Sequence, residues 1–410
     1  MKIAIINLVT KTVNGSPNIL RAANLPKPYI ETDEEINIVE LGIELSKCGQ
    51  EVTIYASDAF RPAKSIVNKI VRLSVIYLPT KLTTLFPYFY FPFTPTLYGE
   101  LLSNEYDVVQ SGEFLQMGTI ISSLASSKKK LPLVIWHELG VQQRFPGNLF
   151  QELYAKTLGK YVLRKANCFI PRSYAARDWL KDKGIPEEKI WSVIHTGVNT
   201  EKFFPLPNNL QIKTKFGIPA DHILLVSVGR LHPFKGFNQL VKAMRYVINK
   251  FPEVSLIIRG NGPQAQQLKN LIEVLKLQEH VKIISRDLSG GELNELYNAS
   301  DFTILTSTKE LFPNFSIIES LACGKPVIHS SLGGERDLGG DGYASYYVKY
   351  GDVKALTETI LFLIKNCDIR KKMSRNALEL VNEEYKMSVV AAKLKKAYDS
   401  ARDKNLSAIS

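Results

Sequence analysis

Two short segments of the chain combine cations, carboxylates and an expected helix start. The first reads SVGRLHPFKG and places Arg230 and Lys235 after the apolar, β-branched run from Ile223 to Val228. Such a run predicts a buried parallel strand, and open α/β sheets bind ligands where strands of this kind end. A guanidinium can grip a phosphate through two hydrogen bonds and an ammonium adds a compact charge, which suits a diphosphate. Taken alone, a solvated turn with two surface cations is the plainer interpretation.

The second segment reads KELFPNFSIIESLACGKPVI and follows another expected strand, Phe302 to Leu305. The chain then passes Glu310 and enters a helix that begins near Phe315 or Ser316. A helix start presents backbone N–H groups and a positive dipole end, so it can hold a diphosphate without a metal. Glu319 lies one turn into this helix, and a solvated helix face is the plainer interpretation of its position. Because the sequence CGKPVI closes the helix and opens a new strand, we expect a βαβ unit with this carboxylate near the ligand-binding edge.

Both segments resemble the C-terminal half of the retaining glycosyltransferases of family 4, also called glycosyltransferases group 1. The family's glycine-rich connection, its helix followed by ASD and a strand, and its end-of-domain signature are matched by Ile258–Pro263, Glu292–Thr306 and Trp191–Pro205. The resemblance covers nearly the whole chain and is strongest from Ile190 to Pro326. It implies an α/β fold of GT-B architecture, in which two Rossmann-like, doubly wound parallel-sheet domains face each other across a cleft.

The resemblance assigns roles to the matching residues of the second half. Arg230 and Lys235 would contact the donor diphosphate and stabilise its charge as the sugar leaves. Glu319 would accept hydrogen bonds from the ribose hydroxyls, and Glu310 would hold hydroxyls of the transferred sugar. The other implied donor-binding positions are Gly229, Gly260, Asn314, Phe315 and Ser316.

One departure from the family concerns the two glutamates. The family separates them by seven residues, whereas eight residues lie between Glu310 and Glu319, so that Leu311 occupies the usual place of the first glutamate. We expect a one-residue insertion in the loop that still lets Glu310 reach the sugar. Loss of that contact is the alternative.

The first half supplies a candidate where an expected strand ends. The pattern Leu133 to Trp136 predicts a buried strand, and it is followed by His137 and Glu138. A lone histidine in such a place is more often structural than functional. Family members commonly place a histidine here, facing the cleft near the transferred sugar, so the resemblance implies that role for His137.

Two further positions of the first half are expected at the acceptor. Glu113 follows the expected strand Asp107–Gln110, although an ordinary loop acid is the plainer interpretation. Asn14 and Gly15 lie in the long connection between Val9 and Glu31, and a loop of that length at the edge of a sheet favours ligand contact.

The length of 410 residues exceeds one ordinary core and predicts two domains. We expect a first, acceptor-binding domain over residues 1–205, with Phe203–Asn209 as the linker, and a second, nucleotide-sugar-binding domain over residues 206–385. A C-terminal helix over 386–410 is expected to pack back on the first domain. The cysteines Cys48, Cys168, Cys323 and Cys367 have no CxxC spacing, which favours reduced thiols in a cytoplasmic protein without a metal site or disulfides.

The formal net charge of +12 favours anionic partners such as nucleoside diphosphates and acidic lipids. No recognisable nucleic-acid-binding module is present, so nucleic acid is not expected as a partner. The start, MKIAIINLV, reads as a first strand rather than a signal peptide. The segment Tyr77–Tyr98 is dense in aromatic residues and prolines, which suits either a packed flap or contact with an acceptor or a membrane surface.

These observations predict a retaining hexosyltransferase that moves a sugar from a UDP- or GDP-sugar to a hydroxyl of a carbohydrate or lipid-linked acceptor. We expect a role in cell-surface polysaccharide or glycolipid synthesis, with no cofactor or metal, in the cytoplasm and peripherally at the inner face of the membrane. Two alternatives are a nucleotide-sugar epimerase of GT-B fold, which needs no acceptor, and a non-catalytic basic protein that binds membrane surfaces. The epimerase is disfavoured by the family 4 motifs.

Overall fold

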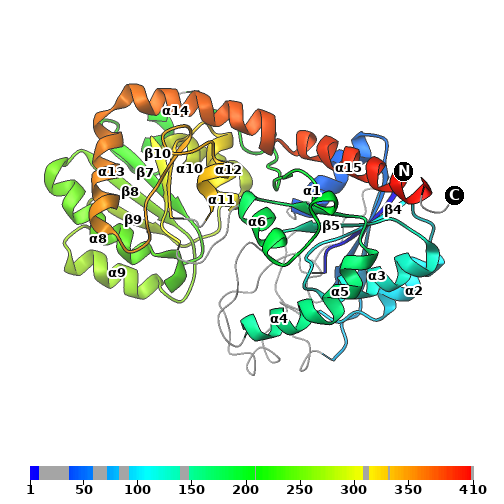
Figure 1. Ribbon diagram of the computed structural model, residues 1–410. Coiled ribbons are helices and arrows are strands. Elements are labelled where there is room, and N and C mark those ends of the chain that lie inside the picture. The colour runs from blue at the N-terminus through cyan, green and yellow to red at the C-terminus, as the bar shows by residue number, and fades with distance from the viewer. Residues whose placement is uncertain are drawn as a thin grey trace. The chain divides into compact units, whose positions relative to one another are not determined.

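The computed structural model describes residues 1–8, 37–58, 72–82, 92–138, 147–207, 209–307, 314–330 and 333–407. The chain divides into two compact units (Figure 1). Unit 1 comprises Met1–Gly197 together with Met387–Ser410, and unit 2 comprises Val198–Lys386. Each unit contains one six-stranded parallel sheet flanked by helices, so the predicted α/β class with two doubly wound sheets is confirmed.

The sheet of unit 1 has the strand order β3-β2-β1-β4-β5-β6. Its strands are β1 (Lys2–Ile6), β2 (Glu51–Ser57), β3 (Leu73–Leu78), β4 (Val108–Ser111), β5 (Leu133–His137) and β6 (Cys168–Pro171). Its helices are α1 (Asn37–Lys47), α2 (Thr96–Ser103), α3 (Met117–Lys129), α4 (Gly147–Lys156), α5 (Leu158–Lys165), α6 (Tyr174–Asp182) and α15 (Met387–Ser407), with a 3₁₀ turn at Glu187–Lys189. This is the doubly wound order, and it places a topological switch point between β1 and β4.

Apolar residues on both faces of β1 explain why this strand is central in unit 1. Ile3 and Ile5 belong to a buried cluster that also contains Leu41 of α1 and Leu394 of α15. Ala4 and Ile6 point to the opposite face and belong to a second buried cluster. The period of two places alternate side chains on opposite faces, so a strand covered by helices on both sides must be apolar throughout.

The sheet of unit 2 has the equivalent order β12-β11-β10-β7-β8-β9. Its strands are β7 (Ile223–Val228), β8 (Val254–Arg259), β9 (Val281–Ile284), β10 (Phe302–Leu305), β11 (Val327–His329) and β12 (Ser345–Tyr347). Its helices are α7 (Asn209–Lys215), α8 (Phe237–Lys250), α9 (Ala265–Val274), α10 (Gly290–Ala299), α11 (Phe315–Ala322), α12 (Gly334–Asp337), α13 (Val353–Lys365) and α14 (Cys367–Leu380). A 3₁₀ turn covers Pro233–Lys235, and a π-helical segment covers Val381–Tyr385.

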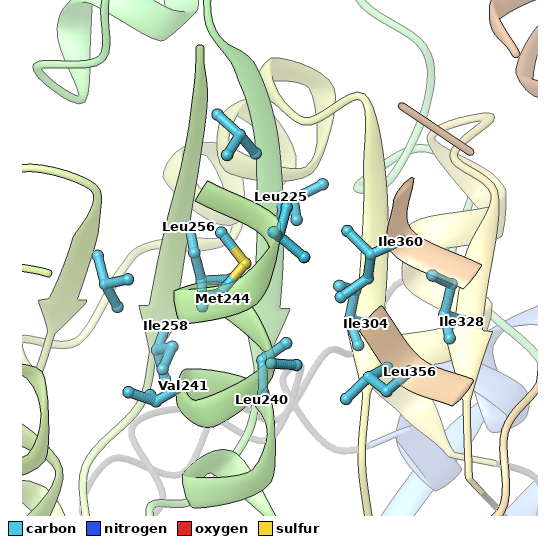
Figure 2. Close-up of a cluster of buried hydrophobic side chains, with 14 of the residues drawn as sticks. Leu225, Leu240, Val241, Met244, Leu256, Ile258, Ile304, Ile328, Leu356 and Ile360 are labelled. Carbon is cyan, nitrogen blue, oxygen red and sulfur yellow. The ribbon is translucent and has the colours of Figure 1, made fainter. Parts of the chain in front are cut away.

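One face of the unit 2 sheet is covered by α8 and α13 (Figure 2). Leu225, Leu256 and Ile304 of the strands pack with Met244 of α8 and Ile360 of α13, and all five side chains are fully buried. Burial of such side chains stabilises the fold by roughly 1.5–3 kcal/mol each relative to exposure. This core holds the strands rigidly, so the connections at the strand ends have a fixed base.

The boundary between the units lies at Gly197 and Val198 and again at Lys386 and Met387. Phe203, the first residue of the expected linker, is buried in unit 2 with its ring 6.0 Å from that of Tyr297. Within the described ranges, no helix combines the length and apolar character that crossing a membrane requires.

Candidate functional site

The residues of unit 2 that the sequence singles out lie on connections that follow three neighbouring strands. Arg230 and Lys235 follow β7, Gly260 follows β8, and Asn314 and Phe315 come after β10. The order β10-β7-β8 makes these strands adjacent, and β7 and β10 form the switch point of the sheet. Because parallel strands all end at the same edge, the connections meet where doubly wound sheets bind ligands.

Backbone contacts hold the connection after β7 in place. The Leu231 N–H donates to the Asn261 carbonyl at 2.9 Å, which ties this connection to the one after β8. The Thr306 hydroxyl, just beyond β10, donates to the Lys235 carbonyl at 3.0 Å. The loop that carries the two cations is therefore fixed to both neighbouring strands.

Two glycines permit this close approach. Gly236 has a φ of 70°, and a Cβ atom there would lie 2.1 Å from the Thr306 carbonyl oxygen. A Cβ atom on Gly260 would lie 1.8 Å from the Gly229 carbonyl oxygen. Any side chain at either position would push the connections apart, so the expected glycine-rich edge has a steric reason.

The cations of this loop gather around one aromatic ring. The Arg230 Cζ atom lies 5.7 Å and the Lys235 Nζ atom 5.8 Å from the centre of the Phe234 ring, within the range of cation–π attraction. Lys235 is only 8% exposed. The sequence from Gly229 to Gly236 contains no Asp or Glu, so the loop adds positive charge to this edge of the sheet.

Helix α11 begins at this same edge. Asn314 is buried and caps the helix, because its side-chain oxygen accepts the Ser316 N–H at 3.1 Å. Phe315, the first residue of the helix, is 48% exposed. The first N–H groups of a helix have no carbonyl partner within the helix, and the dipole adds partial positive charge. This helix start can therefore bind an anion.

Glu319 lies one turn further along α11 and is half-buried. The Tyr297 hydroxyl of α10 donates to its Oε2 atom at 2.8 Å. Burial, and next the negative charge of Glu319, raise the pKa of Tyr297 well above its ordinary value, so this hydroxyl keeps its proton. The carboxylate is thus held by a neutral donor.

In unit 1, Glu113 and His137 lie together beside the end of β5. The Glu113 Oε2 atom lies 2.9 Å from His137 Nδ1, and its Oε1 atom accepts the Glu138 N–H at 3.0 Å. The Phe114 N–H is a more distant neighbour of Nδ1, at 3.4 Å. Trp179 of α6 packs on the fully buried imidazole, with ring centres 4.8 Å apart.

The charges around Glu113 decide its ionisation. Burial by itself raises the pKa of this carboxyl group, but the charges of His137 and Arg172 and the hydrogen bonds it accepts outweigh burial and lower the pKa below its ordinary value. An ionised carboxylate accepts hydrogen bonds only, so we assign a proton to His137 Nδ1 from the shorter of its two contacts, 2.9 Å to Glu113 Oε2 against 3.4 Å to the Phe114 nitrogen. The Nε2 atom of His137 is buried and has no hydrogen-bond partner among the described residues.

Two family models match this chain. The model for Glycosyltransferase Family 4 matches residues 35–202, and the model for Glycosyl transferases group 1 matches residues 208–380. The chain belongs to the family 4, group 1 glycosyltransferases. The family predicted from the motifs is therefore confirmed.

This glycosyltransferase is similar in sequence to proteins from two named organisms. The chain is 26% identical over 287 residues to an uncharacterized glycosyltransferase of Methanocaldococcus jannaschii, covering 69% of this chain and 71% of that protein. It is 25% identical over 263 residues to N,N'-diacetylbacillosaminyl-diphospho-undecaprenol alpha-1,3-N-acetylgalactosaminyltransferase of Campylobacter jejuni, covering 63% and 67% of the two chains.

A solved structure shares the fold of this glycosyltransferase. HepE of Anabaena, crystallised with UDP, aligns with a TM-score of 0.73 and 19% identity over 98% of this chain and 100% of that one. A second structure of HepE contains UDP-glucose and aligns with a TM-score of 0.69. This likeness confirms the GT-B fold.

One charged residue of the glycosyltransferase was missed by the sequence reasoning. Arg172 directly follows β6, its Nη1 atom donates to Glu138 Oε2 at 2.8 Å, and its guanidinium carbon lies 4.1 Å from the centre of the Trp136 ring. The signal that could have found it is a cation immediately after the buried strand Cys168–Pro171, the same pattern that marks Arg230 after β7.

Three predicted site residues of the glycosyltransferase lie outside the described residues: Asn14, Gly15 and Glu310. The effect of the longer glutamate spacing therefore stays a prediction. Of the remaining positions, the structure brings together Gly229, Arg230, Lys235 and Gly260 on adjacent connections. It also brings together the cap residue Asn314 with Phe315, Ser316 and Glu319 of α11. It separately brings together Glu113 and His137 in unit 1.

Proposed function

We propose that this glycosyltransferase moves a hexose, with retention at the anomeric carbon, from a UDP- or GDP-sugar to a hydroxyl of a carbohydrate or lipid-linked acceptor. The observation that carries the proposal lies in unit 2, where the Arg230–Lys235 loop and the start of α11 occupy the switch point between β7 and β10. Two cations and a helix start at one sheet edge suit a diphosphate.

The chemistry follows from where charge develops. The bond between the anomeric carbon and the diphosphate oxygen breaks, and the departing nucleoside diphosphate keeps the electron pair. The acceptor oxygen bonds to the anomeric carbon on the face that the diphosphate leaves, which retains the configuration, and its proton passes to the departing diphosphate oxygen. Arg230, Lys235 and the α11 dipole stabilise the charge of the diphosphate, so the proposed mechanism uses no metal ion.

The other site residues would position the substrates. Glu319 would accept hydrogen bonds from the ribose hydroxyls, as a half-buried carboxylate at this edge can. His137 and Glu310 would orient the transferred sugar. Asn14, Gly15 and Glu113 stay assigned to the acceptor side, where Glu113 would act through its contact with His137.

Two observations support a lipid-linked acceptor. The name of the Campylobacter jejuni relative gives an undecaprenol-linked diphosphate sugar as the acceptor of that enzyme. The net charge of +12 on the present chain favours an anionic membrane surface, where a lipid-linked acceptor would be presented. We therefore propose a peripheral role at the inner face of the membrane in polysaccharide or glycolipid synthesis.

Calorimetric binding of UDP, GDP and ADP in the presence of EDTA tests the donor site. We expect the wild-type chain to bind UDP or GDP, and Glu319→Ala to weaken that binding by about tenfold or more, since hydrogen bonds to a charged group contribute roughly 1.5–3 kcal/mol. Glu358→Ala, at an exposed position of α13 in the same unit, is the control and should bind normally. Absence of binding by all three nucleotides would overturn the proposal.

A further inference from the structure

We propose that Tyr297 is a positioning residue for the donor: it holds the Glu319 carboxylate in the orientation that the ribose hydroxyls require. The inference rests on the proposed function, because it takes Glu319 as the group that contacts the ribose. It extends that function by assigning part of the preference for a ribonucleotide to a residue that does not itself touch the ligand.

The contact between the two residues is short and buried on the tyrosine side. Tyr297 exposes no surface, whereas Glu319 is half-buried on α11, and their side chains meet at 2.8 Å. A hydrogen bond from a neutral hydroxyl to a carboxylate is charge-assisted and stronger than one between neutral groups. The bond therefore links a fixed element of the core to a group at the ligand edge.

Packing fixes the position of the tyrosine hydroxyl. The Tyr297 ring meets Phe203 edge-on, with ring centres 6.0 Å apart and an interplanar angle of 70°. A tyrosine has only two side-chain torsions, and both are restricted when the ring is enclosed. Since burial and the Glu319 charge also keep the hydroxyl protonated, it acts as a constant donor at a constant place.

A fixed hydrogen-bond donor reduces the entropy that the Glu319 side chain must lose when the nucleotide binds. A glutamate side chain loses rotamer freedom when it is ordered, and this cost falls on ligand binding if the free protein leaves the side chain mobile. A carboxylate has about four lone-pair positions, so the Tyr297 bond at Oε2 is compatible with two further bonds from a vicinal diol. Tyr297 thus orders the carboxylate before the nucleotide arrives.

The test compares ribose and deoxyribose ligands in variants that differ by one oxygen atom. Calorimetry measures the affinities of UDP and 2′-deoxy-UDP, and of GDP and 2′-deoxy-GDP, for the wild-type chain, Tyr297→Phe and Tyr385→Phe. Tyr385→Phe is the matched control, because it removes another fully buried hydroxyl of unit 2, which donates to the Asp337 carbonyl of α12. Thermal unfolding of each variant reports the structural cost of losing a buried hydrogen bond.

We expect the wild-type chain and Tyr385→Phe to prefer the ribonucleotide, and Tyr297→Phe to lose most of that preference, with an affinity for the ribonucleotide that falls about tenfold. Glu319→Asp moves the carboxylate away from Tyr297 while keeping its charge, and it should lose the preference as well. If Tyr297→Phe keeps the full ratio of ribose to deoxyribose affinity, Tyr297 only packs and the inference fails while the donor site stands. If the wild-type chain binds none of these nucleotides, the proposed function fails together with the inference.

Discussion

In each of the two sheets, the fifth strand in chain order ends with a histidine. One of these histidines has a carboxylate partner and the other has no hydrogen-bond partner among the described residues. His137 closes β5 of unit 1 with Glu113 Oε2 at 2.9 Å from its ring. His329 closes β11 of unit 2, and neither of its ring nitrogens has a hydrogen-bond partner among the described residues. Both imidazoles are fully buried. Burial without a partner lowers the pKa of His329 to about 4, which shows what enclosure alone does to an imidazole.

The cations at the edges of the two sheets also differ in the residues that surround them. In unit 1, Arg172 forms an ion pair with Glu138, next to the pair of Glu113 and His137. In unit 2, Arg230 and Lys235 lie against the ring of Phe234 on a loop whose sequence contains no acid. The same topology thus carries one edge where acids and bases pair and another where we propose that a cationic loop binds the donor diphosphate. Neutral hydroxyls suit the first edge and a diphosphate suits the second.

The largest effect is expected from removing a cation of unit 2. Lys235→Ala should lower kcat/KM by about 100-fold or more, because in the proposed mechanism this charge stabilises the departing diphosphate. Lys242→Ala, at an exposed position of α8, is the control and should leave turnover unchanged. The measurement is transfer from the donor sugar that binds, with circular dichroism to show that both variants are folded. Wild-type turnover by Lys235→Ala would remove this residue from the mechanism.

The low pKa of His329 predicts that acid destabilises the wild-type chain more than a variant without this histidine. The pKa of His329 is about 4 in the folded chain and about 6.5 in the unfolded chain, so between these values the unfolded state binds a proton that the folded state does not. The folded state therefore loses up to about 3 kcal/mol as the pH falls from above 6.5 to below 4. His329→Gln should remove this part of the pH dependence in urea unfolding. Parallel stability curves for the variant and the wild-type chain between pH 7 and 4 would contradict the expectation.

A smaller effect is expected when His137 loses its ionised partner. Glu113→Gln replaces the ionised partner with a neutral one and should lower the free energy of unfolding of unit 1 by about 1–2 kcal/mol. UDP or GDP affinity should stay within about twofold, because the proposed donor site lies in unit 2. Glu105→Gln, at an exposed position, is the control. The nitrogen shifts of His137 in long-range proton–nitrogen NMR spectra report which ring nitrogens carry a proton, and unchanged shifts in the variant would show that Glu113 does not hold the proton on Nδ1.

Local patterns made much of unit 2 predictable. The strands expected over Ile223–Val228 and Phe302–Leu305 have these bounds in the structure, and the helix expected near Phe315 begins there. Continuous apolar runs predict buried parallel strands, and the residues before Phe315 include a proline and an asparagine, which favour a helix start. The two cations after β7 could be placed at the sheet edge for the same reason, since the end of a strand fixes where its loop begins.

Contacts between distant residues could not be predicted in this way. The bond between Tyr297 and Glu319 joins two helices, and nothing in the local pattern around Tyr297 distinguishes it from an ordinary core tyrosine. Phe203 was expected in a linker, yet the structure buries it beside Tyr297, because the packing partner lies far along the chain. A lone histidine such as His329 carries no local signal of whether a partner will meet it.

The sequence by itself determined the strand and helix order, the family, and the cations at the end of β7, because each depends on residues that are close along the chain. Only the tertiary structure decided that Glu113 supports His137, that Tyr297 holds Glu319, and that Arg172 pairs with Glu138. These pairs join separate elements, and their distances are set by how the elements pack against a shared core. Residue type fixes which bonds a side chain can form, whereas packing fixes which partner lies within 3 Å or so of it.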